Sequence, residues 1–196
     1  MPWTRLHPTM TALAAVVLIG APCAAPAADF ALDPFHTAVF FAVAHFDVSF
    51  VRGRFGKVAG TISFDPEKKT GTVDMRVNPD SIDTGNATLD QILRSPQYLD
   101  TGQFGEVRFS GSDFVFEGDK LVAVDGTLVV RNLPRPVRLT VGRFVCKDVR
   151  AGIVTRYVCG GELRTTIKRS DFGMTNMLGD VGEEVMLIVN VEATRQ

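Results

Sequence analysis

The stretch HTAVFFAVAHF, residues 36–46, decides the fold, because it alternates as a β-strand does and yet carries two apolar rows. Successive side chains of a strand point to opposite faces, and a half-exposed strand normally has one polar face. Here one row is Val39, Phe41, Val43 and His45, and the other is Ala38, Phe40, Ala42, Ala44 and Phe46. We therefore expect both faces to be covered, with His45 closing the bulkier row.

Short alternating runs of the same kind recur along the rest of the chain, with turn residues between them. They lie at about 58–64, 73–77, 109–116, 122–131, 137–141, 163–169 and 185–191. Eight to ten strands at hairpin spacing predict an all-β meander, either a sandwich or a barrel. Closing the barrel removes exposed sheet edges, and an eight-stranded interior is either filled by side chains or holds one small ligand. Because Gly60, Gly126 and Thr165 fall in the inward rows, the sequence favours a cavity.

One segment has helical rather than alternating spacing. In NATLDQILRSPQYLD, residues 86–100, Leu89, Ile92 and Leu93 recur at helical intervals, and Pro96 ends the run. We expect one short helix over about residues 86–95.

The N-terminal segment has the three parts of a secretory signal peptide. MPWTRLH carries one basic residue, TALAAVVLIG is an apolar run, and Ala25-Pro26-Ala27 is a cleavage pattern. We expect residues 1–27 to be this signal peptide and 28–196 to be one domain in the periplasm or outside the cell. Retention of the leader as an anchor is the alternative. No later apolar run is long enough for a stable membrane span.

The net charge and the cysteines indicate further which class of protein the chain belongs to. Of 21 basic residues only Arg5 lies in the leader, so 20 basic and 22 acidic residues remain, a net charge of −2. This is not the basic footprint of a nucleic-acid binder. Cys146 and Cys159 also remain, and an even pair in an exported chain predicts a disulfide. A hairpin turning near residues 151–152 would set them opposite each other, and two reduced thiols are the alternative.

Few residues point to chemistry. His36 and His45 lie in opposite phases of one strand, and no carboxylate is spaced to complete a metal site with them. We expect no metal, no cofactor and no catalytic residue. His45 is interpreted either as a hydrogen-bonded core histidine or as a polar group at a pocket mouth. Arg169 shares the inward phase of Ile167, so we expect it to pair with an acid such as Asp171 or Asp90, or to meet a polar head group.

Four motifs, in order, make the chain resemble the YceI-like proteins. They are HTAVFFAVAHFDVSFVRGRFGKVAGTISFD, SIDTGNATLDQILRSPQYLD, VDGTLVVRNLPRPVRL and TIKRSDFGM, and the resemblance runs from about Phe30 to Glu192. It implies an extended eight-stranded antiparallel lipocalin-like barrel, exported to the periplasm, whose apolar pore holds a polyisoprenoid or similar long-chain amphiphile. The cysteine pair resembles one in a branch of the family. By position, the family's motif residues match His45, Asp90, Leu93, Arg94, Ser95 and the segment 169–174.

The sequence departs from the family pattern at four positions. Leu89 stands where arginine is common and Ile92 where histidine is common, while Gly105 replaces a proline and Asn132 a glycine. If the missing arginine and histidine grip a head group, the ligand of this protein differs from the family's best-known one.

We therefore predict an exported binder of a long-chain isoprenoid or fatty-acyl-type ligand, not an enzyme. The expected ligand-binding residues are Phe41, Val43, His45, Phe55, Ile62, Leu128, Leu139, Ile167, Arg169 and Met174. Two alternatives stay open: a filled barrel that serves as a structural or protein-interaction module, and an enzyme that acts on an amphiphile with His45 as general base. The second apolar row of 38–46, covered by the helix, a loop or another subunit, is also compatible with a homodimer.

Overall fold

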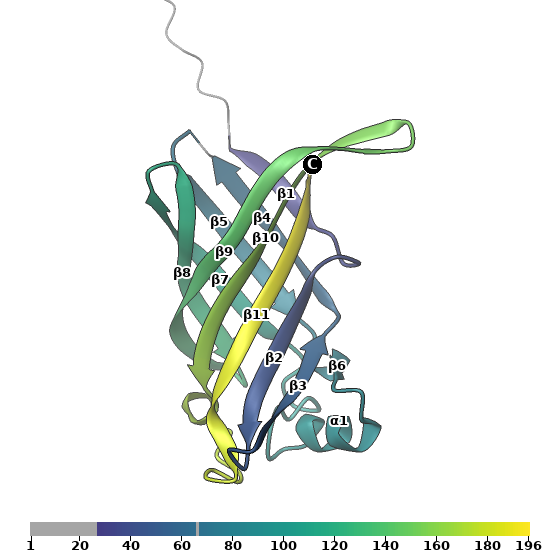
Figure 1. The fold of residues 1–196 in the computed structure, drawn as a ribbon, viewed down its shortest axis with the longest axis vertical. Coiled ribbons are helices and arrows are strands. Elements are labelled where there is room, and N and C mark those ends of the chain that lie inside the picture. The colour runs from purple at the N-terminus through teal and green to yellow at the C-terminus, as the bar shows by residue number, and fades with distance from the viewer. Residues whose placement is uncertain (1–26, 66) are drawn as a thin grey trace, which may run out of the picture.

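The structure, a computed structural model, describes residues 27–65 and 67–196 (Figure 1). The expected signal peptide, residues 1–27, lies outside the described residues except for Ala27, so it stays a prediction.

The described residues contain eleven strands, one α-helix and two short 3-10 helices. The strands are β1 (Ala28–Leu32), β2 (Ala38–His45), β3 (Ser49–Phe55), β4 (Val58–Asp65), β5 (Thr70–Val77), β6 (Ile82–Asp83), β7 (Val107–Glu117), β8 (Lys120–Val130), β9 (Leu133–Ala151), β10 (Val154–Lys168) and β11 (Val181–Arg195). The helices are η1 (Pro79–Ser81), α1 (Ala87–Arg94) and η2 (Arg169–Phe172).

Eight of the strands form a closed antiparallel ring. The order is β1-β4-β5-β7-β8-β9-β10-β11, and β11 pairs back onto β1. Near its C-terminal end β11 pairs with β1, and along its earlier part it pairs with β2, which is followed in the sheet by β3 and β6. The barrel and the single α-helix confirm the predicted fold class.

A side-chain hydroxyl bridges the break between β1 and β2. Thr37, which is 2% exposed, donates from its Oγ1 to the carbonyl of Glu192 and accepts from the Glu192 amide. The amide of Asp33 also donates to the Glu192 carbonyl, at 2.8 Å. The chain therefore changes course at residues 33–37 without leaving this part of β11 unpaired.

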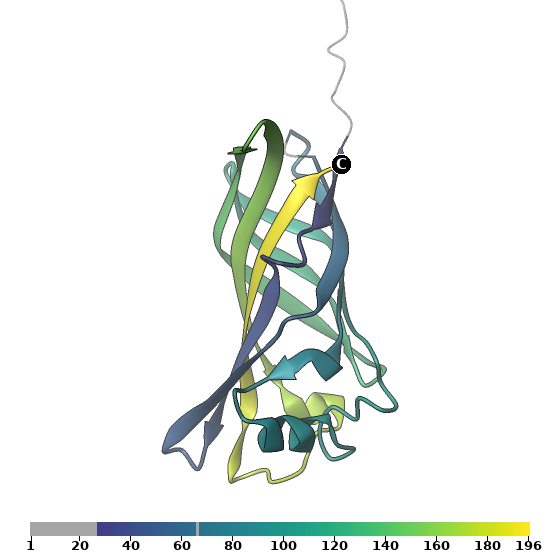
Figure 2. The same ribbon diagram turned by 90° about the vertical axis from the view of Figure 1, so that its right-hand side faces the viewer.

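The two ends of the barrel differ. The C-terminus and the start of β1 lie at the upper end in Figures 1 and 2, and α1 lies at the lower end. Asn86 caps α1 by accepting from the amides of Thr88 and Leu89, and the helix ends at Ser95, before Pro96. The predicted helix over 86–95 is confirmed. Among the described residues, no helix has the length and apolar character needed to cross a membrane.

A bulge in β9 changes which side chains face inward. Val141 pairs with Leu163 and Arg143 pairs with Glu162, so Gly142 has no partner of its own. An extra residue of this kind shifts the alternation of the strand. As a result, Val141 and Phe144 line the same cavity although they lie in opposite phases of the sequence.

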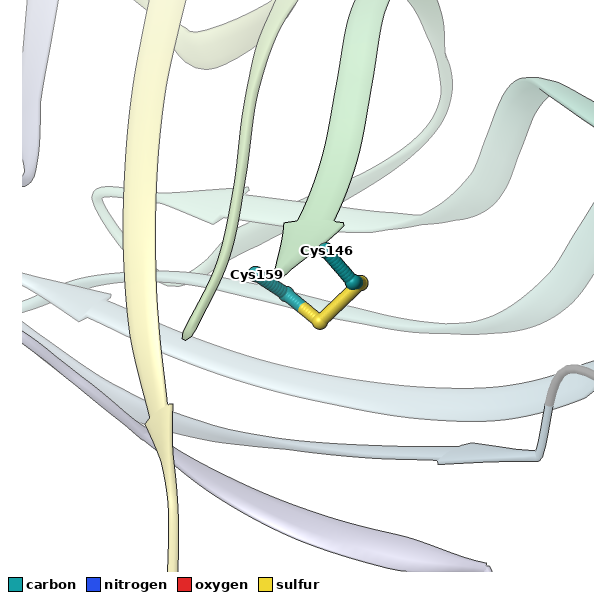
Figure 3. Close-up of a disulfide and its surroundings, with 2 residues drawn as sticks. All are labelled: Cys146 and Cys159. Carbon is teal, nitrogen blue, oxygen red and sulfur yellow. A yellow bond between two sulfur atoms is a disulfide. The ribbon is translucent and has the colours of Figure 1, made fainter. Parts of the chain in front are cut away.

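Beyond the bulge, the predicted disulfide is present. Cys146 of β9 lies directly opposite Cys159 of β10, and the two sulfur atoms are bonded (Figure 3).

The second apolar row of 38–46 is covered only in part. Phe40 is half-buried within the sheet, where it pairs with Arg54 of β3 and Ile188 of β11. Phe46 exposes 52% of its surface, because the chain turns there with a positive φ of 52° and leaves the sheet. The expectation of full cover is therefore wrong at Phe46.

Removing the disulfide is expected to destabilise the barrel. In the chain-entropy model, a cross-link that closes a loop of this length stabilises by roughly 3 kcal/mol. The variant C146A/C159A is therefore expected to lose about that free energy of unfolding in guanidinium titration. Wild-type protein in reductant serves as the control and is expected to lose a similar amount. An unchanged midpoint in both would show that the cross-link does not limit the unfolded chain.

Candidate ligand-binding lumen

The barrel encloses two adjoining apolar cavities. The lower cavity has a volume of about 170 Å³ and the upper one about 70 Å³. Met75, Phe109, Leu139 and Val189 line both, so the cavities meet at the middle of the barrel. We call the two cavities together the lumen.

The surface that faces the lumen is apolar in both cavities. In the described part of the chain, the lining residues with polar side-chain groups are Tyr98, Thr165 and Arg169, all of the lower cavity. The upper cavity is lined by aliphatic and aromatic side chains, two glycines and Cys159, whose sulfur is in the disulfide. No histidine or carboxylate of the described residues lines either cavity.

The structure brings most of the predicted binding residues to this lumen. The lower cavity is lined by Phe41, Val43, Phe55, Leu128, Ile167, Arg169 and Met174, the upper cavity by Ile62, and both by Leu139. Their phases are thus correct, and their contact with a ligand stays a prediction.

His45 is the exception, because it lines neither cavity. It is the last residue of β2, paired with Ser49 and Val181, and its ring stands edge-on to Phe46 at a centroid distance of 4.3 Å. The β2–β3 hairpin continues past the barrel at the lower left of Figure 2, which carries His45 beyond the lumen. The expectation that His45 points into the lumen is therefore wrong.

At two inward glycines, Gly53 and Gly126, an aromatic ring occupies the space of the missing side chain. A Cβ added to Gly53 would lie 2.6 Å from the ring of Phe41, and one added to Gly126 would lie 2.7 Å from the ring of Phe109. Each phenyl ring therefore packs against the barrel wall over a glycine. These glycines let large rings stay at the wall, and the cavity lies inside them.

Arg169 closes the lower end by binding backbone carbonyls. It is 4% exposed, and its guanidinium donates to the carbonyls of Met174, Asn176, Val181 and Gly182 at 2.7–2.9 Å. One planar fork with five N–H groups thereby fixes the loop 173–180 across the end of the barrel. Arg169, which holds this loop, is the first residue of the segment 169–174 that matches a family motif.

The expected salt bridge of Arg169 is not formed. In the described residues its guanidinium has no ion pair with Asp171, Asp90 or another acid. Asp90 instead accepts from the amide and hydroxyl of Thr84. Burial lowers the pKa of Arg169, while the nearby Tyr98 and Glu183 raise it. The guanidinium stays charged because its ordinary pKa is so high.

Aromatic rings close the upper end. Phe64 stacks on Phe114 and Phe116 at 5.9 and 6.4 Å, and meets Phe144 edge-on at 5.7 Å. Above them lies an open hollow of about 440 Å³, which we call the upper hollow, lined in part by Phe144, Tyr157 and the disulfide. The sequence analysis missed this cluster, because Phe144 faces inward only through the Gly142 bulge.

Tyr98 was also missed as a lining residue. It follows α1 in a segment without strand or helix periodicity, and its hydroxyl accepts from the side chain of Asn176 at 3.2 Å. The motif SPQYLD, which contains it, was the only signal for this position.

A histidine and two carboxylates meet at the break between β1 and β2. Nδ1 of His36 lies 2.9 Å from Asp33 Oδ2 and 3.7 Å from Glu192 Oε1. The expectation that no carboxylate is spaced to complete a site with a histidine is therefore wrong at His36, because Asp33 lies three residues before it and Glu192 comes from β11. Asp33 also accepts from the amide of Phe35. The cluster lies outside the lumen and helps to fix the loop.

Comparisons with known proteins agree with this architecture. The sequence profile of the YceI-like domain matches residues 30–193. A UPF0312 protein of Shewanella putrefaciens is 32% identical over 193 residues, 95% of this chain and 97% of that one. A UPF0312 protein of Pectobacterium atrosepticum is 29% identical and covers 97% of this chain and 99% of its own.

Solved structures share the fold at lower identity. BcnA of Burkholderia cenocepacia has a TM-score of 0.67 and 23% identity, covering 83% of this chain and 99% of its own. A polyisoprenoid-binding domain from Saccharophagus degradans has a TM-score of 0.64 and 16% identity, covering 85% and 98%.

Replacing Arg169 is expected to release the lower loop. In R169M, four carbonyls lose their donor, and each buried acceptor left unpaired costs about 1–3 kcal/mol unless water reaches it. We expect a loss of roughly 3 kcal/mol in the free energy of unfolding, with faster amide hydrogen exchange in 173–182. The exposed neighbour provides the control K168M, which is expected to change neither quantity. Equal stability of R169M and wild type would contradict the closing role.

The His36 cluster is expected to show in its titration. Hydrogen bonding and charge attraction to Asp33 raise the pKa of His36 above 6.5, and the same hydrogen bond lowers the pKa of Asp33. A raised histidine pKa stabilises the fold below pH 6.5, and this is lost as the pH rises through the folded value. The lowered carboxyl pKa stabilises above pH 3.8 and is lost on acidification. The ion pair is therefore complete between the two folded values.

NMR titration of the His36 ring checks this assignment. D33N is expected to bring the His36 pKa back towards 6.5, while E192Q is expected to change it less, because Glu192 contributes the smaller attraction. An unchanged pKa in D33N would show that the contact does not persist in solution.

Proposed function

This chain belongs to the YceI-like family, and from that premise we propose that it is an exported protein that binds and carries a polyisoprenoid or similar long-chain amphiphile. The observation that carries the proposal is the lumen, whose wall is apolar along its length, with Tyr98, Thr165 and Arg169 among the residues that line its lower part. Its shape suits a chain-like ligand better than a compact one.

The dimensions support an extended ligand. Both Ile167, in the lower cavity, and Cys159, in the upper one, belong to β10. Eight residues of strand separate them, which corresponds to about 26 Å at roughly 3.3 Å per residue. A chain that lies along this path is in contact with apolar side chains throughout.

Burial of the chain supplies the affinity. Each ligand methylene removed from water contributes roughly 0.8 kcal/mol, while association costs about 4–15 kcal/mol. Several isoprene units are therefore enough for tight binding without any specific contact to the head group. Selectivity then depends on lumen length and on the polar groups of the lower part.

The head group is proposed to lie at the lower end. The hydroxyl of Tyr98 accepts from Asn176, and its own hydrogen has no acceptor among the described residues. Arg169 uses four of its five N–H groups on carbonyls, which leaves one. Together with Thr165, these groups suit a small polar head that accepts hydrogen bonds.

Export and carriage rest on three further points. The disulfide fits an oxidising compartment, the leader has the parts of a signal peptide, and a structural neighbour from S. degradans is described as binding polyisoprenoid. For the alternatives, an open lumen argues against the filled module, and the lumen wall offers no histidine or carboxylate in the described residues for acid–base catalysis.

Blocking the lumen tests the proposal with a matched pair of variants. Thr165 and Thr166 are neighbours on β10 that point to opposite faces, the first into the lower cavity and the second into solvent. T165F places an apolar ring in the lumen, and it is expected to lower the amount of bound lipid at least tenfold, since each tenfold is about 1.4 kcal/mol. T166F is expected to bind as wild type does.

The measurement is native mass spectrometry of protein purified from its host, before and after organic extraction. Uptake of a fluorescent polyprenyl probe from detergent micelles provides the second readout. Wild type that carries no lipid and takes up no probe, or T165F and T166F that bind equally, would contradict the proposal.

A further inference from the structure

β9 and β10 continue beyond the barrel as a two-stranded hairpin, residues 145–158, which we call the arm (Figure 1). β8 pairs with β9 only as far as Thr140, and β11 pairs with β10 only from Val158 onward. From Lys147 to Tyr157 the two strands therefore pair only with each other. A lone two-stranded hairpin is marginally stable in water, and the disulfide at Cys146 and Cys159 fixes this one at its base.

The outer face of the arm alternates small aliphatic and basic residues. Lys147 is paired with Val158, and Val149 with Arg156, so these four side chains share one face. With Val145 and Val154, which fall in the same alternation, they form what we call the valine face. Exposed Ile153 ends the arm, with 97% of its surface accessible.

The charge on this face has one sign. Asp148, the only acid of the arm, is paired with Tyr157 on the opposite face. Lys147 and Arg156 form no ion pair in the described residues. The whole chain has a net charge of −1, so this is a local concentration of unpaired positive charge.

The β2–β3 hairpin, at the opposite end of the molecule, also exposes apolar side chains. Phe46, Val48 and Phe50 are exposed at the β2–β3 hairpin, and the acidic residue Asp47 lies among them. Acidic groups oppose contact with an anionic surface, whereas basic groups favour it. The lower tip also carries Arg52 over the Phe50 ring, and the upper hollow beside the arm is lined in part by Asp65, Glu67 and Asp119, so the preference for an anionic surface belongs to the valine face alone.

The arm leads to the lumen. Its base residues Cys146 and Tyr157 line the upper hollow together with Phe64 and Phe144. Phe64 and Phe144 also line the upper cavity, so these two rings separate the hollow from the lumen. A surface in contact with the arm would therefore lie next to the upper entrance.

From these observations we propose that the valine face and tip of the arm dock on the surface of a bilayer that contains anionic phospholipids. Its purpose, to hold the upper end of the lumen against the source or acceptor of the lipid, rests on the proposed function. The docking itself does not. The exposed aliphatic side chains enter the interface, and Lys147 and Arg156 meet the lipid phosphates.

Flotation with vesicles tests the docking. Purified protein with its disulfide intact is mixed with vesicles of phosphatidylethanolamine and phosphatidylglycerol, or of phosphatidylcholine alone. Wild type is expected to float with the anionic vesicles, less so with added salt and little with the neutral ones. K147Q/R156Q is expected to bind at least about tenfold more weakly, since each basic residue near an anionic bilayer contributes about 1 kcal/mol.

Matched variants locate the contact on the molecule. I153D at the arm tip is expected to lose vesicle binding, whereas V48D at the other hairpin tip and K168Q on the barrel are expected to keep it. All five positions are exposed, and unchanged thermal unfolding would confirm folded variants. Wild type that does not float, or I153D and K147Q/R156Q that float as wild type does, would overturn the proposal. So would a dimer that forms through the arm and dissociates in I153D without any vesicle binding.

Uptake of the polyprenyl probe separates the two proposals. From micelles, the arm variants are expected to take up probe as wild type does; from anionic vesicles, they are expected to take it up more slowly. Wild type that floats but takes up no probe would contradict the carrier proposal and leave the docking supported.

Discussion

The hydrogen-bonded closure of the sheet is the constraint on which the rest of the structure depends. β11 pairs with β1 near its C-terminal end and with β2 along its earlier part, so one strand joins the two ends of the meander. The strand ladder is interrupted at the kink between β1 and β2. There the Thr37 hydroxyl hydrogen-bonds the carbonyl and the amide of Glu192 in place of a backbone partner. Once the ring is closed, alternate side chains must point to a common interior, and the lumen follows from the closure.

Most of the fold and of the lumen lining was predictable from the alternation of apolar residues in the sequence. The strands, the helix at 86–95 and the cysteine pair follow from local patterns, and nine predicted binding residues line the lumen. The predictions that failed concern features that do not show in the alternation of apolar residues. The bulge at Gly142 reverses the phase of β9, and the end of β2 carries His45 past the cavity. The partners of Arg169 are backbone carbonyls, which no residue pattern reveals.

The lumen is not filled, because large aromatic rings pack against glycines of the surrounding strands. Phe41 and Phe109 are large enough to fill the interior, but Gly53 and Gly126 allow their rings to pack at the wall. Gly126 therefore adds no space of its own, whereas Thr165 does line the lower cavity. The space comes from where the large side chains are held, and Tyr98, Thr165 and Arg169 line its lower part only.

The different closures of the two ends have a consequence for the timing of exchange. At the upper end, the passage is blocked by phenylalanine rings, and it opens when side chains rotate. At the lower end, a guanidinium binds four carbonyls, and it opens only when these bonds break together as a local unfolding event. Side-chain rotation is much faster than loop opening. The barrel thus has an upper end that opens faster and a lower end that opens more slowly, and an amphiphile bound as proposed, with its head at the lower end, would be retained by the half of the molecule that moves least.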